Sequence, residues 1–234
     1  AKYIFENLNP ATDIYFSQGP MDVLDHSCSK LGFGGKMCID GTKKFEEELD
    51  EDHGSQVIQN IFHQDFLKNK FPEVHAVNTN LLKKEIPCLI ISVKKSRKDH
   101  IRDLHLQICG LKEIQGTKMI LYVEHTVDAN DLPNALWRFC NNLDPKRDHI
   151  LYKGKESEPL TPGQKPSCCM GFDGTRKTKE FDDFQRDWPN IIVADNATIK
   201  SIDEKWMELG LGNFISSPSL KFKSQMYGEE AIVN

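Results

Sequence analysis

One phrase occurs twice in this sequence, and its residue types could bind an anion. It reads "MCIDGTKK" at residues 37–44 and "MGFDGTRK" at residues 170–177. An Asp followed by Gly and Thr favours a turn closed by the carboxylate, with glycine supplying any positive φ. The paired cations could neutralise that carboxylate, lie along a partner's surface or reach a phosphate. We interpret the phrase first as a structural turn with a local ion pair, and the other two roles stay open.

Two further stretches have residue types suited to chemistry. Asp25 and His26 are adjacent and invite an acid–base role, although a single loop histidine is more often a hydrogen-bonding or surface residue. The run Gly32–Gly35, "GFGG", could cradle a phosphate, but it precedes no clear strand-to-helix turn and is a weak signal. The remaining histidines show no ligand spacing: His53, His63, His75, His100, His105, His125 and His149.

The cysteines do not form a recognisable framework. They are odd in number and lack CxxC spacing: Cys28, Cys38, Cys88, Cys109, Cys140, Cys168 and Cys169. The adjacent pair Cys168 and Cys169 could form a strained disulfide or half of a metal site. We favour reduced thiols, several of them buried, in a cytoplasmic protein, and the spacing predicts no metal site.

Composition limits the possible partners. The chain has 234 residues, 38% hydrophobic and 28% charged, with a net charge of −5, which argues against nucleic acid or an anionic membrane. The longest apolar run, Cys88–Val93, is far shorter than the roughly 20 residues of a transmembrane segment. No signal peptide is present, and Ala1 falls as if within an amphipathic helix, so we expect a fragment of a longer protein.

The first third of the chain predicts few regular elements. We expect the tail of a helix over residues 1–10, a strand over Asp13–Gln18 and a long structured loop over Met21–Lys36. The charge run at residues 43–54 indicates a solvated helix or a linker. A helix from an N-cap at Ser55 to Phe71 follows.

The remaining elements alternate, which predicts an α/β fold with helices packed on a layered mixed sheet. In the helix capped by Asp131, we expect Leu136, Trp137 and Cys140 on the inner face. The last 20 residues have no periodicity and are expected to form an arm that packs on a partner. The predicted strands span residues 74–79, 88–94, 118–124, 149–152 and 190–194, and the predicted helices span 99–109, 131–140 and 196–209.

The repeated phrase lies in a longer repeat. Asn-Leu-x-Pro-x-x-Asp occurs at residues 7–13 and again at 142–148, and the intervals from proline to methionine are 27 and 25 residues. Both copies follow one order: helix end, proline break, strand, long loop, then the Asp-Gly-Thr turn. We interpret this as an internal duplication.

These motifs resemble the C-terminal signature of the UbiD-type decarboxylases, the 3-polyprenyl-4-hydroxybenzoate carboxy-lyase family. The first copy carries it in "GPMDVLDHSCSKLGFGGKMCIDGTKKF", and the second in "KMILYVEHTVDANDLPNALWRFCNNLDPKRD", "MGFDGTRK" and the closing "SIDEKWMELGL". The second copy departs from the family pattern: it has "SEPLTP" where the first has "MDVLDH". The resemblance therefore implies that residues 1–52 end a first C-terminal region and that residues 55–234 form a second, degenerate copy of that domain.

The resemblance also implies a function for a parent protein. The family decarboxylates aromatic or unsaturated carboxylic acids with prenylated FMN and a divalent metal, and a 4-hydroxybenzoate-type precursor of ubiquinone or menaquinone is the expected substrate class. The catalytic groups belong to upstream flavin-binding domains, so no catalytic, cofactor-binding or metal residue is predicted here, and no cofactor is expected on the fragment alone. Only a substrate-pocket loop is carried over, with Asp22, Leu24, Asp25 and His26; Lys112, near a family phosphate contact, is expected to be merely exposed.

Three functions stay open from the sequence. The first is the C-terminal assembly part of a homo-oligomeric carboxy-lyase, which shapes the pocket and has no reactive centre. The second is a non-catalytic α/β protein-interaction module. The third and least supported is an independent enzyme that uses Asp25, His26 and the basic turns.

Overall fold

The computed structural model describes residues 1–48, 62–154, 168–228 and 230–233. The chain divides into two compact units, Ala1–Arg186 and Asp187–Asn234. Ser55, the 52–55 boundary and the second half of the charge run lie outside the described residues. Within these described ranges, no helix is long and apolar enough to cross a membrane.

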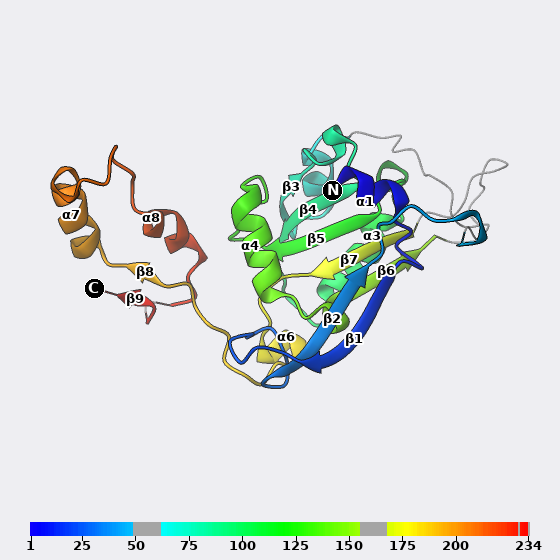
Figure 1. Ribbon diagram of the computed structural model, residues 1–234, viewed down its shortest axis with the longest axis horizontal. Coiled ribbons are helices and arrows are strands. Elements are labelled where there is room, and N and C mark those ends of the chain that lie inside the picture. Colours follow the sequence, from blue (N-terminus) through cyan, green and yellow to red (C-terminus); the bar gives the residue numbers. More distant parts are fainter. Residues whose placement is uncertain (49–61, 155–167, 229, 234) are drawn as a thin grey trace. The chain divides into compact units, whose positions relative to one another are not determined.

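The first unit is built on a five-stranded mixed sheet (Figure 1), which confirms the predicted fold class. The strand order is β3-β4-β5-β7-β6. Strands β4, β5 and β7 are parallel, and the two edge strands run antiparallel to their neighbours. The strands are β3 (Val74–Asn78), β4 (Cys88–Val93), β5 (Met119–Glu124), β6 (His149–Lys153) and β7 (Cys168–Asp173).

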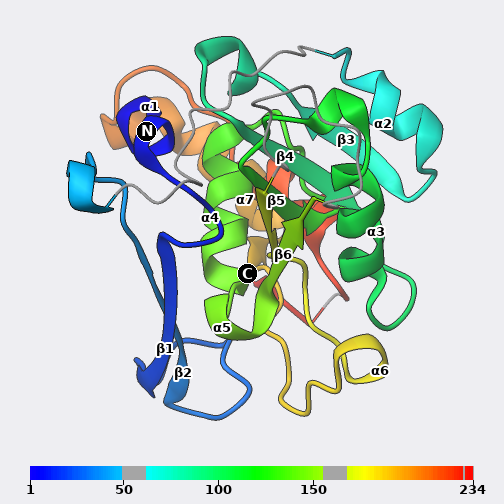
Figure 2. The ribbon, with the colours of Figure 1, turned by 90° about the vertical axis from the view of Figure 1, so that its right-hand side faces the viewer.

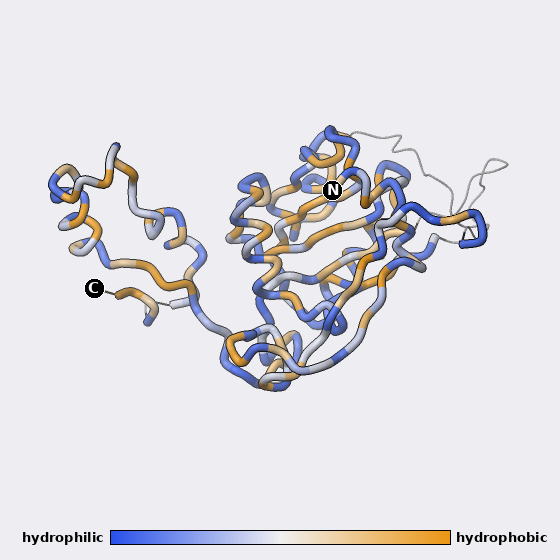
Figure 3. Tube along the Cα trace, viewed as in Figure 1, coloured by the Kyte–Doolittle hydropathy of each residue, from blue (hydrophilic) through white to orange (hydrophobic). Residues whose placement is uncertain are grey.

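Helices cover both faces of this sheet. Alternate strand side chains point to opposite faces, and two hydrophobic cores result. One core lies under α2 (Asp65–Lys70) and α3 (His100–Cys109), and the other under α4 (Leu132–Asn142). Figure 2 shows α3 and α4 on opposite sides of the sheet, and Figure 3 shows hydrophobic residues concentrated along its strands.

A separate hairpin joins the second core. Strands β1 (Ile14–Pro20) and β2 (Phe33–Ile39) pair antiparallel, and α1 (Lys2–Asn7) precedes them. Side chains from both strands, including Phe16 and Met37, pack against the core under α4. The predicted loop over Met21–Lys36 is therefore too long, because its last residues form β2. Glycines at 34 and 35 obscured that strand in the sequence.

The sequence pattern predicted the buried face of α3 but not that of α4. Ile101, Leu104 and Ile108 of α3 are buried as expected. On α4, however, Leu136 and Trp137 are 39% and 50% exposed, and the buried side chains are Asn134, Ala135, Arg138, Phe139 and Asn142. The expected inner face was wrong because polar contacts orient this helix, as described below.

The second unit contains short elements. The predicted strand over residues 190–194 is reduced to β8 (Val193–Ala194), which pairs in parallel with β9 (Ile232–Val233). The predicted helix over 196–209 is divided into α7 (Asn196–Lys205) and a 3-10 turn, η4 (Trp206–Leu209). The arm contains a further helix, α8 (Pro218–Phe222), followed by the turn η5 (Lys223–Gln225).

The other short elements lie in the first unit. They are the 3-10 turns η1 (Glu46–Glu48), η2 (Leu82–Lys84) and η3 (Lys112–Ile114), and the short helices α5 (Pro145–Asp148) and α6 (Lys179–Asp182). Lys112 is exposed on η3, as expected.

Candidate functional site at the carboxyl edge of the sheet

Polar residues gather where the parallel strands end. Strands β4, β5 and β7 all finish at the same edge, at Val93, Glu124 and Asp173. Ligands of α/β sheets usually bind outside the carboxyl ends of the strands. This edge is therefore the natural place to look for a site.

The second copy of the repeated phrase forms a closed polar network at this edge. The Asp173 carboxylate accepts hydrogen bonds from Thr175 N at 2.9 Å and Thr175 Oγ1 at 2.5 Å. Lys177 Nζ donates to the carbonyl oxygens of Asp173 (2.6 Å) and Thr175 (2.8 Å), and lies 3.6 Å from Asp148 Oδ2. Asp148 in turn accepts from Asp144 N at 2.9 Å. The turn, the strand start and the helix end are thus tied together.

The two carboxylates respond differently to this network. Burial holds the pKa of Asp148 above its ordinary value, despite the charges of Lys177 and Arg147. Burial also acts to raise the pKa of Asp173, but Lys177, Lys95 and the hydrogen bonds from Thr175 outweigh it, so that pKa is lowered. Asp173 is therefore the anion around which the turn is built.

The first copy of the phrase forms the same network in the hairpin. Asp40 accepts from Thr42 N (2.9 Å) and Thr42 Oγ1 (2.6 Å), and Lys44 Nζ lies 2.6 Å from Asp40 and 3.7 Å from Asp13. Asp13 accepts from Asn9 N at 2.8 Å. Hydrogen bonds from Lys44 and Thr42 hold the pKa of Asp40 well below its usual value. Both copies therefore use the second cation as a structural counter-ion.

The strand registers of the two copies also agree. Ile14 pairs with Ile39 in the hairpin, and His149 pairs with Phe172 in the sheet. In each case the pair lies one residue inside the two aspartates of the network. The repeated phrases thus occupy equivalent backbone positions, which the sequence predicted from their spacing alone.

A cleft of about 180 Å³ opens beside the second network. Most of its charged groups are already paired with one another. Lys95 contacts Asp182 at 2.8 Å, Lys98 contacts Asp183 at 2.9 Å, and Arg147 holds both Asp148 oxygens at 2.7 Å. The lining comes from residues 95 and 98–102, Arg147–Ile150, Asp173, Lys177 and Phe181–Asp183. Such a wall offers little net charge to attract an anion.

A buried network stands at the end of β5. Glu124 is 6% exposed and accepts from Arg138, from Asn142 Nδ2 (3.2 Å) and from Arg176 N (3.0 Å). Asn142 Nδ2 also contacts the Gly174 carbonyl oxygen at 3.2 Å. These bonds fix the face that α4 turns to the sheet, since an unpaired buried carboxylate would be costly. Sequence reasoning missed this network, although Arg138 and Asn142 have the i,i+4 spacing of one helix face.

The predicted pocket-loop residues fall in two successive turns. Asp22 Oδ1 accepts from Leu24 N at 2.8 Å, and Leu24 itself is 85% exposed. Asp25 Oδ1 accepts from Ser27 N (2.9 Å) and Ser27 Oγ (2.6 Å). Both acids therefore shape the loop through bonds to its own backbone. Among the described contacts, only His26 of the four predicted pocket residues reaches α4.

His26 does reach the buried network. Its Nε2 lies 3.4 Å from Asn142 Oδ1, and Asn142 is bonded to Glu124. Burial, together with the charges of Arg138 and Arg186, lowers the pKa of His26 by more than Asn142 and Asp25 raise it, so the ring is neutral at neutral pH. Arg147 secures the same loop by donating to Ser27 O at 2.7 Å and Ser29 Oγ at 3.1 Å. The loop is thus docked firmly on the end of α4 and on α5.

The cleft beside the second network does not fit a flavin. Cofactor pockets span roughly 300–1,000 Å³, more than the cleft provides. The glycine run that could have cradled a phosphate enters β2, and Gly35 N donates to Asp144 Oδ1 at 3.1 Å. We therefore derive no reaction step through a cofactor.

The chain thus contains an α/β domain in which most polar side chains at the carboxyl ends of the parallel strands bond to one another. The family model of the 3-octaprenyl-4-hydroxybenzoate carboxy-lyase C-terminal domain matches residues 1–41 and 55–174, more than half of the chain. The chain therefore belongs to this family, the UbiD family, through its C-terminal domain. Both matched stretches end at the glycine of the repeated phrase, Gly41 and Gly174.

Relatives extend over much of the chain. A protein of Helicobacter pylori strain J99, whose function is uncharacterised, is 30% identical over 215 residues, covering 87% of this chain and 29% of that protein. An uncharacterised protein of Aeropyrum pernix is 28% identical over 124 residues, covering 52% of this chain and 25% of that protein. The chain thus spans less than a third of the length of these relatives.

Solved structures show more distant likeness. The vanillic acid decarboxylase of Sedimentibacter hydroxybenzoicus in its closed form is 20% identical, with a TM-score of 0.46 over 63% of this chain and 30% of that one. The UbiD-class enzyme HmfF of Pelotomaculum thermopropionicum is 18% identical, with a TM-score of 0.38 over 53% of this chain and 28% of that one.

Proposed function

We propose that this chain is the C-terminal part of a non-oxidative carboxy-lyase that decarboxylates an aromatic or unsaturated carboxylic acid. A 4-hydroxybenzoate-type precursor in ubiquinone or menaquinone synthesis is the substrate class. The parent protein uses prenylated FMN and a divalent metal, both bound by its upstream flavin-binding domains. The family match carries this proposal, and the chain's short span relative to its relatives is consistent with it.

Within the parent, this part shapes the pocket mouth and supports assembly. The Asp22–His26 loop is anchored at its end, where His26 contacts Asn142 and the next residue, Ser27, contacts Leu143 and Arg147, so it can present a defined surface to the catalytic domains. Asp22, Val23 and Leu24 are the exposed members of that loop. Asp22 and Leu24 are proposed to face the substrate pocket, with Asp25 and His26 fixing their position.

The domain organisation follows from the repeat. We propose that residues 1–52 end a first copy of the domain and that residues 55–234 form a second, degenerate copy. In the second copy, β7 has strand neighbours on both sides, β6 and β5. Its counterpart β2 pairs only with β1 among the described strands. The second edge of β2 is therefore proposed to receive a parallel strand from the upstream part of the parent.

Exposed apolar residues support an assembly role. Trp137 and Leu136 stand on the outer face of α4, and the second unit exposes Met207 (81%), Leu211 and Ile215. Such groups are typical of surfaces that pack on another subunit or domain. We accordingly propose that the parent is a homo-oligomer.

Two measurements test the proposal. Full-length parent protein, loaded with prenylated FMN, is expected to release CO₂ from at least one hydroxylated aromatic acid in a panel, and no turnover of any member would contradict the carboxy-lyase assignment. In a separate titration, residues 1–234 are expected to leave the absorbance and fluorescence of FMN unchanged. Tight stoichiometric binding would overturn the upstream placement of the cofactor.

The alternative is a non-catalytic α/β interaction module. The apolar outer face of α4 favours it equally, because that face would serve any protein partner. Sedimentation of the full parent separates the two: an active oligomer supports the carboxy-lyase, whereas an inactive protein that still self-associates supports the module.

A further inference from the structure

A cluster of metal-ligating side chains lies in the core between α3 and the sheet. It consists of His105 and Cys109 on α3 and Cys169 on β7, and one ligand atom from each lies within 4.8 Å of the others. All three residues are at most 3% exposed. Neither the cleft nor the loop described above includes them.

The backbone places these ligands on facing surfaces. His105 and Cys109 are four residues apart, so they share the helix face that packs on the sheet. Cys169 and Gly171 are two residues apart on β7 and point to the same side. A Cβ atom at Gly171 would lie 2.6 Å from His105 Nδ1, so only glycine leaves room for the imidazole.

We propose that His105, Cys109 and Cys169 bind a zinc ion. Two thiolates and an imidazole are ligands that Zn²⁺ prefers, and its charge of +2 would be cancelled by the two thiolates, which suits an apolar core. Tetrahedral coordination with ordinary Zn–S and Zn–N bonds separates sulfur from nitrogen by about 3.5 Å. Cys109 Sγ lies 3.5 Å from His105 Nε2 and 3.7 Å from His105 Nδ1, so the sulfur lies beside the ring, and a rotation of the Cys109 side chain would have to bring it to a metal on Nε2.

The surroundings supply the supporting contacts of such a site. His105 Nδ1 lies 3.0 Å from the Tyr122 hydroxyl, which would fix the ring while Nε2 binds the metal. The Cys169 carbonyl oxygen lies 3.3 Å from Nε2 and is an oxygen close enough to complete the coordination.

The rival interpretation is a hydrogen-bonded core histidine beside two thiols, with no metal. Metal content distinguishes the two. Residues 1–234, produced without a metal-affinity tag in zinc-supplemented medium, are expected to contain about one zinc per chain by mass spectrometry. Cys109→Ser and Cys169→Ser should lose it, whereas Cys28→Ser, a buried cysteine outside the cluster, should keep it. A wild-type chain with no more zinc than Cys109→Ser would overturn the proposal.

A second measurement needs no variant that might unfold. Metal-free wild-type chain, shown to be folded by circular dichroism, is titrated with Co²⁺. Tetrahedral thiolate ligation should produce a thiolate-to-cobalt charge-transfer band and intense visible absorption, and zinc should abolish both. A folded chain that gives neither band rules out the site.

Discussion

The two hairpins of this chain carry the same polar network in different surroundings. In β6–β7, the side chain of Lys177 is 2% exposed, and β5 flanks the turn. In β1–β2, Lys44 is similarly buried at 7%, but its partner Asp40 is 36% exposed. The residues of the repeated phrase therefore specify the turn by themselves, while the neighbouring elements decide how much each turn contributes to stability.

The first prediction concerns removal of the equivalent lysine from each network. Lys177→Met leaves Asp148 and Asp173 buried without their shared counter-ion, and we expect a loss of about 3–5 kcal/mol in the free energy of unfolding. Lys44→Met should cost less, because only one of its two partners, Asp13, is buried and water can solvate Asp40. Urea unfolding followed by circular dichroism measures both, and equal losses would contradict the comparison.

The second prediction adds one methyl group to each turn. A Cβ at Gly174 would lie 2.5 Å from Phe139 Cδ2 and 2.9 Å from Tyr122 O, and neither neighbour can move freely. A Cβ at Gly41 would lie 2.5 Å from Ile4 Cγ2 on the exposed helix α1. Gly174→Ala should destabilise the chain by about 2–3 kcal/mol, and Gly41→Ala by less, since α1 can shift. Thermal melts of the two variants should show the same order.

The third prediction concerns the residue before each proline. Asp144 caps α5 and also accepts from Gly35 N of the other hairpin, whereas its counterpart Asn9 accepts only from Ala11 N among the bonds described for its side chain. We expect Asp144→Ala to cost about 2 kcal/mol and Asn9→Ala about 1 kcal/mol or less. Hydrogen exchange at Gly35 should accelerate only in Asp144→Ala. Unchanged exchange there would show that the hairpins are not linked through Asp144.

The smallest predicted effect is a pH dependence. The pKa of His26 is lower in the folded chain than the ordinary value of 6.5, so the unfolded chain binds more protons just below that pH. Stability from His26 should therefore be present above pH 6.5 and be lost as the pH falls below it. The pKa of His125 is lowered as well, so the wild-type slope includes both residues. His26→Gln should flatten the slope of unfolding free energy between pH 7.5 and 5.5, and an unchanged slope would assign it to other groups.

The sequence allowed four strands of the sheet and the repeat to be predicted, but not the internal strand β7 (Cys168–Asp173) or every contact. Strands β4 and β5 are buried along their whole length and mostly apolar, and the Asp-Gly-Thr turns depend on neighbours within a few residues. The buried face of α4 depends instead on Glu124, which lies 14 residues before Arg138 in the chain and bonds it across space. The zinc cluster was missed for the same reason, since Cys169 lies 64 residues after His105. Its one local signal was the His-x-x-x-Cys spacing on α3.

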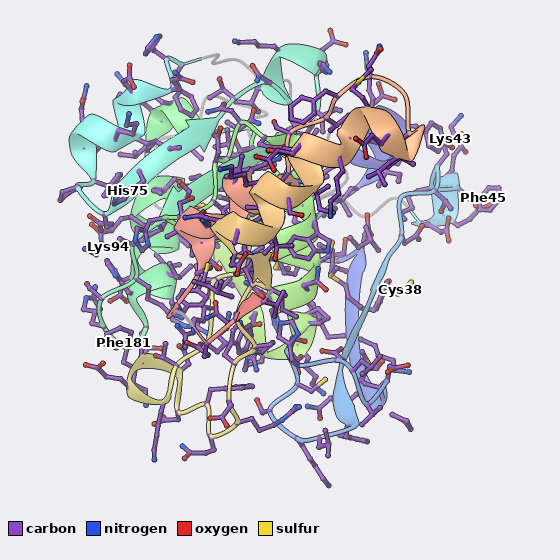
Figure 4. All side chains as sticks on the ribbon, turned by 90° about the vertical axis from the view of Figure 1, so that its left-hand side faces the viewer. Cys38, Lys43, Phe45, His75, Lys94 and Phe181 are labelled. Atoms are coloured by element: carbon purple, nitrogen blue, oxygen red, sulfur yellow. The ribbon has the colours of Figure 1, made fainter. Side chains whose placement is uncertain are left out.

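The residues after the turn also differ in solvent exposure between the two copies, and the sequence did not predict which copy is more exposed. Lys43 and Phe45, after the first turn, lie at the outer margin of the hairpin (Figure 4), and Phe45 is 73% exposed. The equivalent of Lys43 is Arg176, whose backbone N–H is bonded to Glu124. His75 and Lys94 lie near each other at the outer sheet edge (Figure 4), close to His125. The same local sequence is thus open to solvent in one copy and tied to the sheet in the other.

The local ion pairs of the turn have an evolutionary consequence. A segment that begins at a helix end and finishes at the basic pair carries the lysine that neutralises both of its aspartates, so a duplication of that segment would bring its main counter-ion with it. Substitutions could then accumulate in the rest of the duplicate. The two aspartates and their lysine would be retained, because the fold of the turn depends on them.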